Sequence, residues 1–303
     1  MLLYDFAIIG GGPTGYSAAM YAGRLNLKTL ILSGNPGGLI VTTQIVENYP
    51  GFKRITGVEL FQKVQDHAKE YSITEFFEHA QDVARETQNF VIKTKKTHYH
   101  AKTVLFATGA KYRKLSAIGA EKFENKGVHY CALCDGFAYK DKIVAIVGGS
   151  DSAAKEALEL SELAQKVYII HRGENIKPEP INKDRIMRSK KIEIITKTNV
   201  VEILGQDVVE AVKLDASYKE STTLPLSGIF IAIGHIPQSD LAQKLGVAVN
   251  EKKEIIIDRY ARTNIPGVYA AGDVADTAFK QMIIGCAEGV FAAYQAFNHI
   301  HTP

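Results

Sequence analysis

The sequence has few cysteines, no low-complexity tract and no long apolar run. Three cysteines in 303 residues are too few for the disulfide framework of a small secreted protein. The chain contains no run of about 18 apolar residues of the kind that crosses a membrane, and its N-terminus lacks the basic and small-residue pattern of a signal peptide. We therefore expect a cytoplasmic protein that does not bind a membrane and whose thiols are kept reduced.

A strong excess of one charge is also missing. The chain has 36 basic and 33 acidic residues, a net charge of +3, so its overall charge gives no reason to expect nucleic-acid binding. Hydrophobic residues make up 46% and charged residues 23%, which is typical of a globular protein. Because 303 residues exceed the usual length of one domain, we expect two domains.

Two of the three cysteines, Cys131 and Cys134, are separated by only two residues. This spacing is typical of a thiol pair that opens and closes a disulfide. The alternative is half of a zinc site, but such a site needs four ligands. The third cysteine, Cys286, stands alone in an apolar helical stretch and is expected in the core, and no two histidines have ligand spacing. Redox chemistry is therefore favoured, and we predict no metal site.

The first thirty residues predict a dinucleotide-binding βαβ unit. Residues 4–9 resemble a strand, residues 10–15 form a glycine-rich turn, and residues 16–24 have a helical pattern. A second strand is predicted over residues 27–33. Two strands joined in this way must be parallel, and the crossover must be right-handed.

The turn keeps all three glycines of the G-x-G-x-x-G motif, in the strand-to-helix context that makes the motif informative. Gly10 would permit the tight turn, Gly12 would let the backbone approach a pyrophosphate, and Gly15 would let helix and strand pack closely. A turn that serves packing alone is the alternative. Ser33 replaces the acidic residue expected to hold a ribose hydroxyl, so the ribose must be bound in another way.

The same pattern returns in the middle of the chain. Residues 142–147 are apolar and β-branched, residues 148–153 form a turn, residues 154–164 are helical in pattern, and residues 167–170 predict another strand. The chain therefore contains two predicted dinucleotide folds.

Two further apolar strands are predicted over residues 103–107 and 267–271, followed by Thr108-Gly109 and Gly272-Asp273. The carboxyl ends of such strands are where loops meet a ligand. Asp273 could cap the next helix. Because the first glycine motif is also present, we favour the other interpretation, in which Asp273 contacts the ribityl chain of a flavin.

Taken together, seven motifs that cover almost the whole chain resemble the low-molecular-weight thioredoxin reductase family. They are Gly10 to Gly15, Gly37-Gly38 with Glu47 to Gly51, Ala107 to Gly109, Cys131 to Gly136, Gly148 to Ala153, Gly234 to Pro237, and Arg262-Thr263 with Gly272-Asp273. The resemblance implies an α/β fold with two Rossmann-like dinucleotide-binding domains, the second inserted into the first. An FAD-binding domain would span residues 1–111 and 240–303, and a pyridine-nucleotide-type domain with the cysteine pair would span residues 112–239. It also implies a homodimer and rotation of the insert against the FAD-binding domain. We predict the hinges near residues 112–114 and 237–240, because the chain crosses between the domains there.

The resemblance assigns roles to the cysteine motif. Cys134 would face the flavin, Cys131 would attack the disulfide of a thioredoxin-like protein, and Asp135 would supply or remove the thiol proton. These roles fit the chemistry, because exchange requires a thiolate and a nearby acid can protonate a leaving thiol. The resemblance also places FAD against these residues: Gly10, Gly12, Pro13, Thr14, Gly15, Gly38, Asn48, Thr108, Gly109, Gly272, Asp273, Gln281 and Met282.

The nicotinamide site departs from the family pattern. The residues that would form it are Gly148, Ser150, Asp151, Ser152, Ala153, His171, Arg172 and Lys177. Ser150 replaces the middle glycine, and the family's NADPH-specific form has two consecutive arginines and a third four residues later, where this chain has Arg172, Gly173 and Lys177. Guanidinium groups grip a 2′-phosphate better than a lysine does, and Glu174 adds repulsion.

Three electron donors therefore stay open. The donor could be NADPH held by Arg172 and Lys177, NADH, or a non-nicotinamide carrier such as ferredoxin or a reduced deazaflavin. A basic helical run over residues 183–191 could dock an acidic carrier, although such a run is more often a solvated helix face.

The sequence thus predicts an FAD-dependent thioredoxin-disulfide reductase, with a thioredoxin-like protein as its partner. A dithiol oxidase that passes electrons to oxygen would use the same motifs. A nonenzymatic redox or nucleotide sensor is a further alternative, but a sensor would not require the acid at Asp135.

Overall fold

The computed structural model describes residues 2–43 and 46–301, which form two compact units. One unit comprises Met1–Lys111 and Ile236–Pro303, and the other comprises Tyr112–His235. The second unit is therefore inserted into the chain of the first. Strands β7 (Ala110–Tyr112) and β16 (His235–Pro237), which contain the two crossing points, pair with each other.

The first unit is built on a seven-stranded sheet with the order β3-β2-β1-β6-β5-β4, in which β17 pairs with β6. Its strands are β1 (Leu3–Ile9), β2 (Thr29–Leu32), β3 (Ile73–Phe76), β4 (Asp82–Glu86), β5 (Asn89–Lys93), β6 (His98–Phe106) and β17 (Val268–Ala270). Strands β3, β2, β1, β6 and β17 are parallel, and β4 and β5 form an antiparallel extension. Ile9 pairs with Leu32 and Phe106, so the ends of β1, β2 and β6 lie together.

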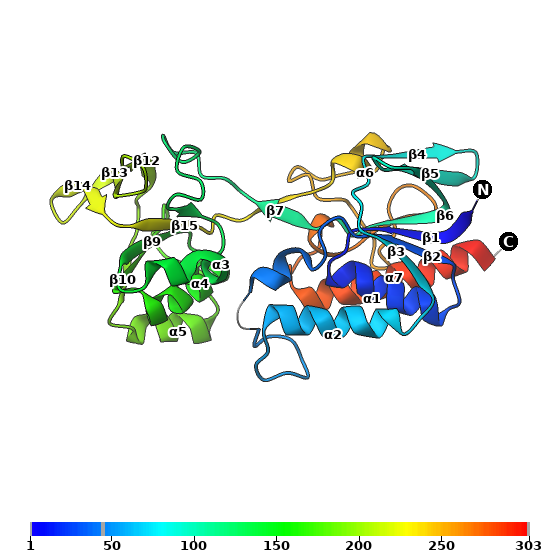
Figure 1. Cartoon of the computed structure of the whole chain (residues 1–303), viewed down its shortest axis with the longest axis horizontal. Helices are drawn as coiled ribbons and strands as arrows, with labels where there is room; N and C mark the ends of the chain where they lie inside the picture. The colour runs from blue at the N-terminus through cyan, green and yellow to red at the C-terminus, as the bar shows by residue number, and fades with distance from the viewer. Residues whose placement is uncertain (1, 44–45, 302–303) are drawn as a thin grey trace. The chain divides into compact units, whose positions relative to one another are not determined.

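Helices cover this sheet, and α1 and α7 lie side by side (Figure 1). The helices and turns are α1 (Pro13–Arg24), η1 (Gly38–Thr42), α2 (Gly57–Lys69), α6 (Asp240–Lys244), η3 (Gly272–Val274) and α7 (Met282–His301). A Cβ atom on Gly289 would lie 2.5 Å from the Thr14 carbonyl oxygen, so only glycine lets α7 approach α1 this closely. Helix α1 comes from the start of the chain and α7 from its end.

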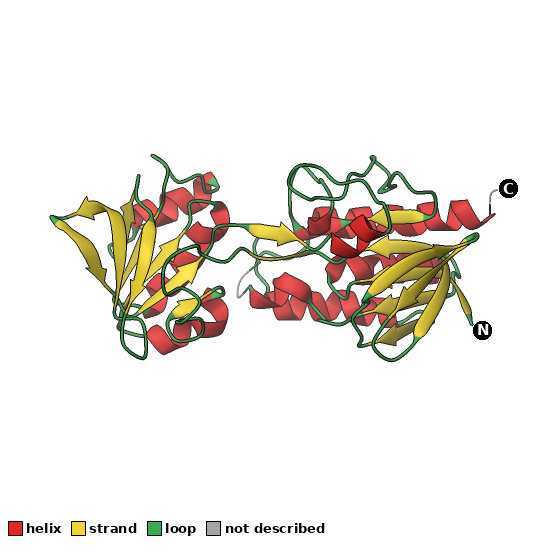
Figure 2. Cartoon of the chain, turned by 90° about the horizontal axis from the view of Figure 1, so that it is seen from above, coloured by secondary structure: helices red, strands yellow, loops and turns green. Residues whose placement is uncertain are grey.

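The second unit has a parallel five-stranded sheet with the order β11-β10-β9-β15-β8 and a separate antiparallel sheet of β12, β13 and β14. Figure 2 shows the strands of the chain in yellow and its helices in red. Its strands are β8 (Val128–His129), β9 (Ile143–Val147), β10 (Lys166–Ile170), β11 (Ile192–Ile195), β12 (Val200–Leu204), β13 (Ala211–Tyr218), β14 (Ser221–Pro225) and β15 (Gly228–Ile231). Its helices are α3 (Ala132–Asp135), η2 (Gly136–Tyr139), α4 (Asp151–Leu163) and α5 (Pro180–Arg188). Strand β9, helix α4 and strand β10 form the second predicted βαβ unit.

Two helix starts differ from the prediction by three residues. Helix α1 begins at Pro13 rather than at residue 16, because Gly12 is the N-cap and proline is well suited to the first helical position. Helix α4 begins at Asp151 rather than at residue 154, with Ser150 as its N-cap. Both glycine turns are therefore tighter than the hydrophobic pattern indicates, and the backbone N–H groups of each helix start sit directly at the turn.

Within the described residues, every helix is too short or too polar to cross a lipid bilayer.

Candidate functional site

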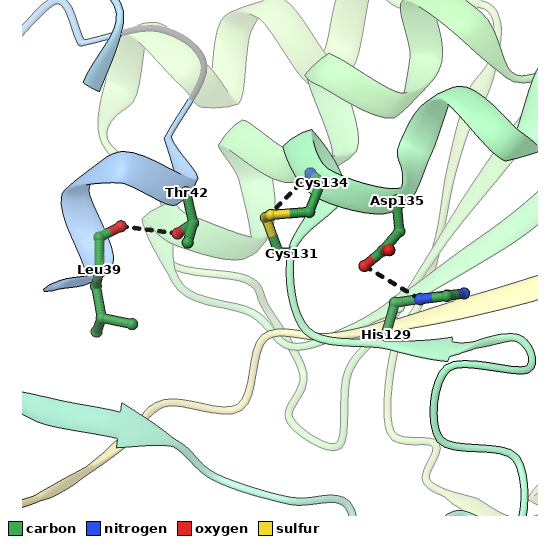
Figure 3. Close-up of a disulfide and its surroundings, with 6 residues drawn as sticks. All are labelled: Leu39, Thr42, His129, Cys131, Cys134 and Asp135. Carbon is green, nitrogen blue, oxygen red and sulfur yellow. Dashed lines mark hydrogen bonds and ion pairs between the residues drawn. A yellow bond between two sulfur atoms is a disulfide. The ribbon is translucent and has the colours of Figure 1, made fainter. Parts of the chain in front are cut away.

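Cys131 and Cys134 form a disulfide at the start of α3 (Figure 3). Cys131 is the N-cap residue, and its sulfur accepts a hydrogen bond of 3.1 Å from the backbone N–H of Cys134. Cys131 is only 8% exposed, whereas Cys134 is exposed. The Cys134 N–H therefore holds the Cys131 sulfur at the start of α3.

The predicted acid, Asp135, ends α3 and points toward His129 on strand β8 (Figure 3). Its Oδ2 atom lies 3.1 Å from His129 Nδ1. On the other side of the ring, His129 Nε2 lies 2.7 Å from the Tyr139 hydroxyl. Burial lowers the pKa of His129, although the charge of Asp135 opposes this shift. Sequence reasoning did not identify His129 or Tyr139, because neither belongs to a recognisable motif.

Helix α4 packs beneath the cysteine motif and brings a carboxyl group to it. A Cβ atom on Gly136 would lie 2.9 Å from Leu160 Cδ2, which shows how closely α4 approaches. Glu156 on α4 interacts with the backbone N–H of Ala132, and one of its carboxyl oxygens is buried without a partner among the described residues. Burial raises the pKa of Glu156 to about 8, and the charge of Glu159 contributes to the rise. A second titrating group therefore lies beside α3.

The first glycine turn has the geometry that its three glycines predict. Gly10 has φ of 128°, and a Cβ atom there would lie 2.1 Å from the Ala107 carbonyl oxygen. A Cβ atom on Gly15 would lie 2.0 Å from the Gly10 carbonyl oxygen, so helix and strand touch there. Gly12 differs, because a Cβ atom on it would meet nothing within 4 Å among the described residues. The backbone at Gly12 is therefore open to a ligand.

Predicted FAD residues from both ends of the chain meet at Thr14. A Cβ atom on Gly272 would lie 2.6 Å from Thr14 Oγ1, and one on Gly285 would lie 2.5 Å from it. Gly272 has φ of 78° and opens the η3 turn that carries Asp273. The structure thus brings the Pro13–Gly15 turn and the Gly272-Asp273 turn together.

Glu288 holds the Gly272 turn in place. Its carboxylate accepts hydrogen bonds from the Gly272 backbone N–H at 2.8 Å and from the Thr277 hydroxyl at 2.6 Å. Sequence reasoning missed Glu288, since a lone acidic residue in an otherwise apolar helix carries no motif. The one sequence signal was that Glu288 is the single acidic residue of the apolar stretch over α7 (Met282–His301).

Two more pairs of residues distant in sequence are joined in this unit. Asn48 Nδ2 donates to Gln281 Oε1 at 2.9 Å, directly before Met282 begins α7. Thr108 exchanges hydrogen bonds with Gln238, whose backbone N–H also binds the Gly109 carbonyl. The predicted residues Asn48, Gln281, Thr108 and Gly109 therefore lie in loops that are held by specific contacts. For Gly38, a Cβ atom would lie 3.8 Å from the Gly12 Cα atom, so these two turns adjoin.

Ser33 is completely buried, and its hydroxyl lies where a Cβ atom on Gly11 would be, 1.8 Å away. The side chain therefore packs under the glycine turn. Ser33 Oγ has no hydrogen-bond partner among the described residues. Ser33 therefore packs against the turn, and the predicted absence of an acidic ribose contact at this position is seen in the structure as a buried serine.

The second glycine turn is more enclosed. Gly148 has φ of 156°, and a Cβ atom there would lie 2.3 Å from the Ala232 carbonyl. The His171 ring lies against Gly149, where a Cβ atom would be 2.4 Å from its Nδ1. The Lys177 backbone N–H donates to the Gly149 carbonyl at 2.6 Å. Backbone and ring contacts thus surround the turn from which Ser150, Ser152 and Ala153 start α4.

The carboxylate of Asp151 is already engaged by its own unit. It accepts hydrogen bonds from the Glu179 N–H and the Asn182 amide, both at 2.8 Å, and pairs with Lys155 at 2.7 Å. These contacts lower the pKa of Asp151 in spite of its burial. Asp151 therefore fastens the start of α5 to α4.

Arg172 and Lys177 are both exposed at the end of β10. Glu174, the predicted source of repulsion, lies 2.6 Å from Lys197 Nζ, and this ion pair offsets its charge. The basic residues of α5, Lys183, Arg185 and Arg188, are also exposed. Among the described residues, no group of three or more His, Cys, Asp or Glu side chains is arranged to hold a metal ion.

Comparisons with known proteins agree with this arrangement. A family model described as pyridine nucleotide-disulphide oxidoreductase matches residues 4–289. A thioredoxin reductase of Listeria innocua is 36% identical and covers 98% of this chain and 94% of its own. This chain belongs to the thioredoxin reductase family. It is an FAD-dependent disulfide oxidoreductase, as predicted from its motifs.

Solved structures of thioredoxin reductases confirm the predicted α/β fold with two Rossmann-like domains. The crystal structure of the Lactococcus lactis enzyme has a TM-score of 0.94 and 34% identity, covering 98% of this chain and 99% of its own. A ferredoxin-flavin thioredoxin reductase of Clostridium acetobutylicum is 32% identical, with a TM-score of 0.53, and covers 99% of each chain. Solved relatives of this chain therefore include an enzyme that is named for ferredoxin.

The described residues fit FAD, the cofactor of this thioredoxin reductase family. The open backbone at Gly12 and the start of α1 can receive a pyrophosphate. The adjoining Gly272 turn and the loops at Asn48 and Thr108 surround the same end of the sheet. A side chain at Gly12 would project into the open part of this turn.

Proposed function

We propose that this chain reduces the disulfide of a thioredoxin-like protein through the Cys131–Cys134 pair. The observation that carries the proposal is a disulfide at the start of α3, with a backbone N–H aimed at Cys131 and an acid at Asp135. FAD, when bound, supplies the two electrons that convert this disulfide to two thiols. We propose that residues 1–111 and 240–303 form the FAD-binding domain and that residues 112–239 form the pyridine-nucleotide-type domain.

The thiol chemistry then needs two exchange steps. The Cys131 thiolate attacks one sulfur of the acceptor disulfide, which forms a mixed disulfide and releases one acceptor thiolate. Cys134, after losing its proton, attacks the Cys131 sulfur, restores the internal disulfide and releases the second acceptor thiolate. The pair loses two electrons, and the acceptor gains two electrons and two protons: the proton that Cys134 gives up passes through Asp135 to one leaving thiolate, and the second proton comes from solvent.

The two cysteines differ in accessibility in the oxidised state. Cys134 is exposed, and Cys131 is nearly buried. Attack on a protein disulfide therefore requires Cys131 to become exposed once the pair is reduced. We propose that the insert rotates about the chain crossings at residues 112–114 and 237–240 to achieve this.

Two classes of donor are compatible with the surface of the second unit. Arg172 and Lys177 are exposed beside the turn at Ser150, where a nicotinamide dinucleotide with or without a 2′-phosphate would bind. The exposed basic face of α5 instead suits an acidic carrier such as ferredoxin, for which the Clostridium acetobutylicum enzyme is named.

Anaerobic titration of the FAD-loaded protein decides between these donors. NADPH, NADH and reduced ferredoxin are added separately, and the loss of flavin absorbance is followed, with oxidised thioredoxin present in a second series. We expect one donor to bleach the flavin and to yield thioredoxin thiols. If NADPH is that donor, Arg172→Ala should raise its KM by about tenfold or more, since a charge-assisted contact is lost.

A parallel assay in air, with a small dithiol and with oxidised thioredoxin in separate samples, tests the competing functions. A dithiol oxidase would consume oxygen with a small dithiol and would not reduce thioredoxin. A nonenzymatic sensor would bind nucleotide or change its thiol state without turnover. Either outcome would contradict the proposed reductase.

We also propose that two copies of the chain form a homodimer. Exposed apolar side chains on and near α7 support this, namely Tyr260, Phe291 and Tyr294, which are 37%, 44% and 48% exposed. The Tyr260 and Phe291 rings are in contact, with centroids 6.3 Å apart. A second copy is the occupant that would cover this surface. Sedimentation equilibrium of the parent protein should give the mass of two chains, and Phe291→Glu should give the mass of one. A parent protein that sediments with the mass of one chain would refute the dimer.

We place the protein in the cytoplasm, where a donor-driven dithiol reductase has both its electron source and its acceptor. The low cysteine content supports this location.

A further inference from the structure

Asp135 has a polar partner that the redox motif does not include. Its carboxylate lies 3.1 Å from Nδ1 of His129, a side chain that is almost completely buried (Figure 3). Strand β8 places His129 beside α3, and β8 pairs with β15 in the central sheet. The sheet therefore fixes the position of the His129 backbone beside α3.

The ring of His129 is fixed on its remaining sides. It stacks on Phe230, with ring centroids 5.3 Å apart, and meets the Tyr139 ring edge-on at 5.4 Å. The Tyr139 hydroxyl lies 2.7 Å from Nε2. Tyr139 is in turn placed by Gly228, where a Cβ atom would lie 2.3 Å from the tyrosine ring. The three groups Tyr139, His129 and Asp135 thus form one continuous polar chain through a packed core.

The protonation of this chain follows from the burial of its middle member. Burial lowers the pKa of His129, so the imidazole is neutral near pH 7 and has one N–H. With Asp135 ionised, that N–H sits on Nδ1 and faces the carboxylate, and Nε2 accepts a hydrogen bond from the Tyr139 hydroxyl. The 3.1 Å contact between Nδ1 and the carboxylate does not have hydrogen-bond geometry in this oxidised structure, so Nδ1 is a buried polar atom that a small turn of the Asp135 carboxylate would satisfy.

We propose that His129, supported by Tyr139, is a positioning residue for Asp135. Its Nδ1–H orients the carboxylate and stabilises the charge that remains when Asp135 has passed its proton to a leaving thiolate. In this step the O–H bond of Asp135 breaks, an S–H bond forms, and no electrons are exchanged with His129. The catalytic consequence rests on the proposed reductase function, but the polar chain can be tested without it.

Other charged groups face this cluster, and their titration must be distinguished from that of Asp135. Lys142 lies over the Tyr139 ring, with its nitrogen 5.6 Å from the centroid. Glu156 on α4 titrates near the start of α3, since burial raises its pKa to about 8. Glu156→Gln removes that second titration, so the experiment is done in both the parent and the E156Q background.

The test measures the titration of Asp135 directly, by carbon-13 NMR of the FAD-loaded, oxidised protein labelled at aspartate carboxyl carbons. The resonance that disappears in Asp135→Asn is assigned to Asp135. His129→Leu should raise the titration midpoint by about one pH unit, because the variant loses the N–H group that lies beside the charged carboxylate. His129→Asn, which keeps a side-chain N–H near the Nδ1 position, should restore most of the shift. An unchanged midpoint in folded His129→Leu would overturn the proposal.

Two further variants keep the result interpretable. Tyr139→Phe retains the ring and removes only the hydroxyl, and it should raise the same midpoint by a smaller amount; it replaces His129→Leu if that variant does not fold. Phe230→Leu removes packing from His129 without changing a polar atom, and its midpoint should stay at the parental value. If Phe230→Leu shifts Asp135 as far as His129→Leu does, packing and not the N–H controls the carboxyl, and the proposal is wrong.

Thioredoxin reduction is measured on the same samples. In a working reductase, the limb of the pH profile that depends on Asp135 should move with the NMR midpoint, changing the rate at a fixed pH on that limb by about tenfold. A parent protein that does not reduce thioredoxin would refute the proposed function and would leave the NMR result to decide the role of His129.

Discussion

Replacing Cys134 with serine should abolish turnover with thioredoxin while leaving FAD bound. Without Cys134, the internal disulfide cannot form, and a mixed disulfide between Cys131 and the acceptor cannot be resolved. We expect the rate of thioredoxin reduction to fall by at least about a thousandfold. The flavin absorbance should remain, because the glycine turn at Gly10–Gly15 lies in the other unit. The measurement is steady-state reduction of thioredoxin with the donor identified by titration.

Cys286→Ser is the matched control for this loss. Cys286 is a free, buried thiol on α7, and burial raises its pKa, so it is a poor nucleophile. The control variant should keep nearly all of the parental activity. Comparable loss in both variants, or full activity in Cys134→Ser, would contradict the role of the Cys131–Cys134 pair.

Gly10→Ala should destabilise the folded protein, whereas Gly12→Ala should weaken FAD binding. At Gly10 the backbone has φ of 128°, and the new Cβ atom would lie 2.1 Å from the Ala107 carbonyl oxygen. We expect the first unit to lose about 3 kcal/mol or more of its free energy of unfolding, since backbone strain and a steric clash combine. At Gly12 the new atom meets no described protein atom within 4 Å.

Gly12→Ala should therefore fold with nearly parental stability but bind FAD at least about tenfold more weakly, a loss of about 1.4 kcal/mol. The methyl group would occupy the space through which the backbone approaches the pyrophosphate. Urea unfolding of the FAD-free proteins and fluorescence titration with FAD separate the two effects. Equal FAD affinity in Gly12→Ala and the parent would show that the pyrophosphate does not bind at this turn.

Local patterns in the chain were sufficient for some elements of the fold and not for others. The apolar runs at residues 4–9 and 142–147 predict β1 and β9 closely, because buried parallel strands are continuous stretches of apolar residues. The starts of α1 and α4 were predicted three residues too late. Pro13 breaks a helix interior and Asp151 is polar, so neither residue continues an apolar helical pattern, although both are favoured in the first turn of a helix. The antiparallel sheet of β12, β13 and β14 carries no functional motif and was not predicted.

The candidate site divides in the same way. Cys131, Cys134 and Asp135 lie within five consecutive residues, so they form a motif from which their chemistry can be predicted. Glu288, His129 and Tyr139 act only through contacts with residues distant in sequence or on another element. A lone glutamate or histidine has no pattern of its own, and nothing short of the packed structure could identify these three.

The sequence by itself predicted two dinucleotide folds and a redox-active cysteine pair, because each of these motifs lies within six consecutive residues. The resemblance of the ordered motifs to the thioredoxin reductase family then implied a flavin-dependent disulfide reductase. Only the packed tertiary structure decided which side chains support the glycine turns and the cysteine pair. Ser33 fills the space at Gly11, Glu288 ties the end of the chain to its beginning, and a buried histidine faces the acid of the redox motif. Such contacts arise only when sheet and helices bring distant segments to within a few ångströms, and their energies depend on burial, which a linear sequence does not contain.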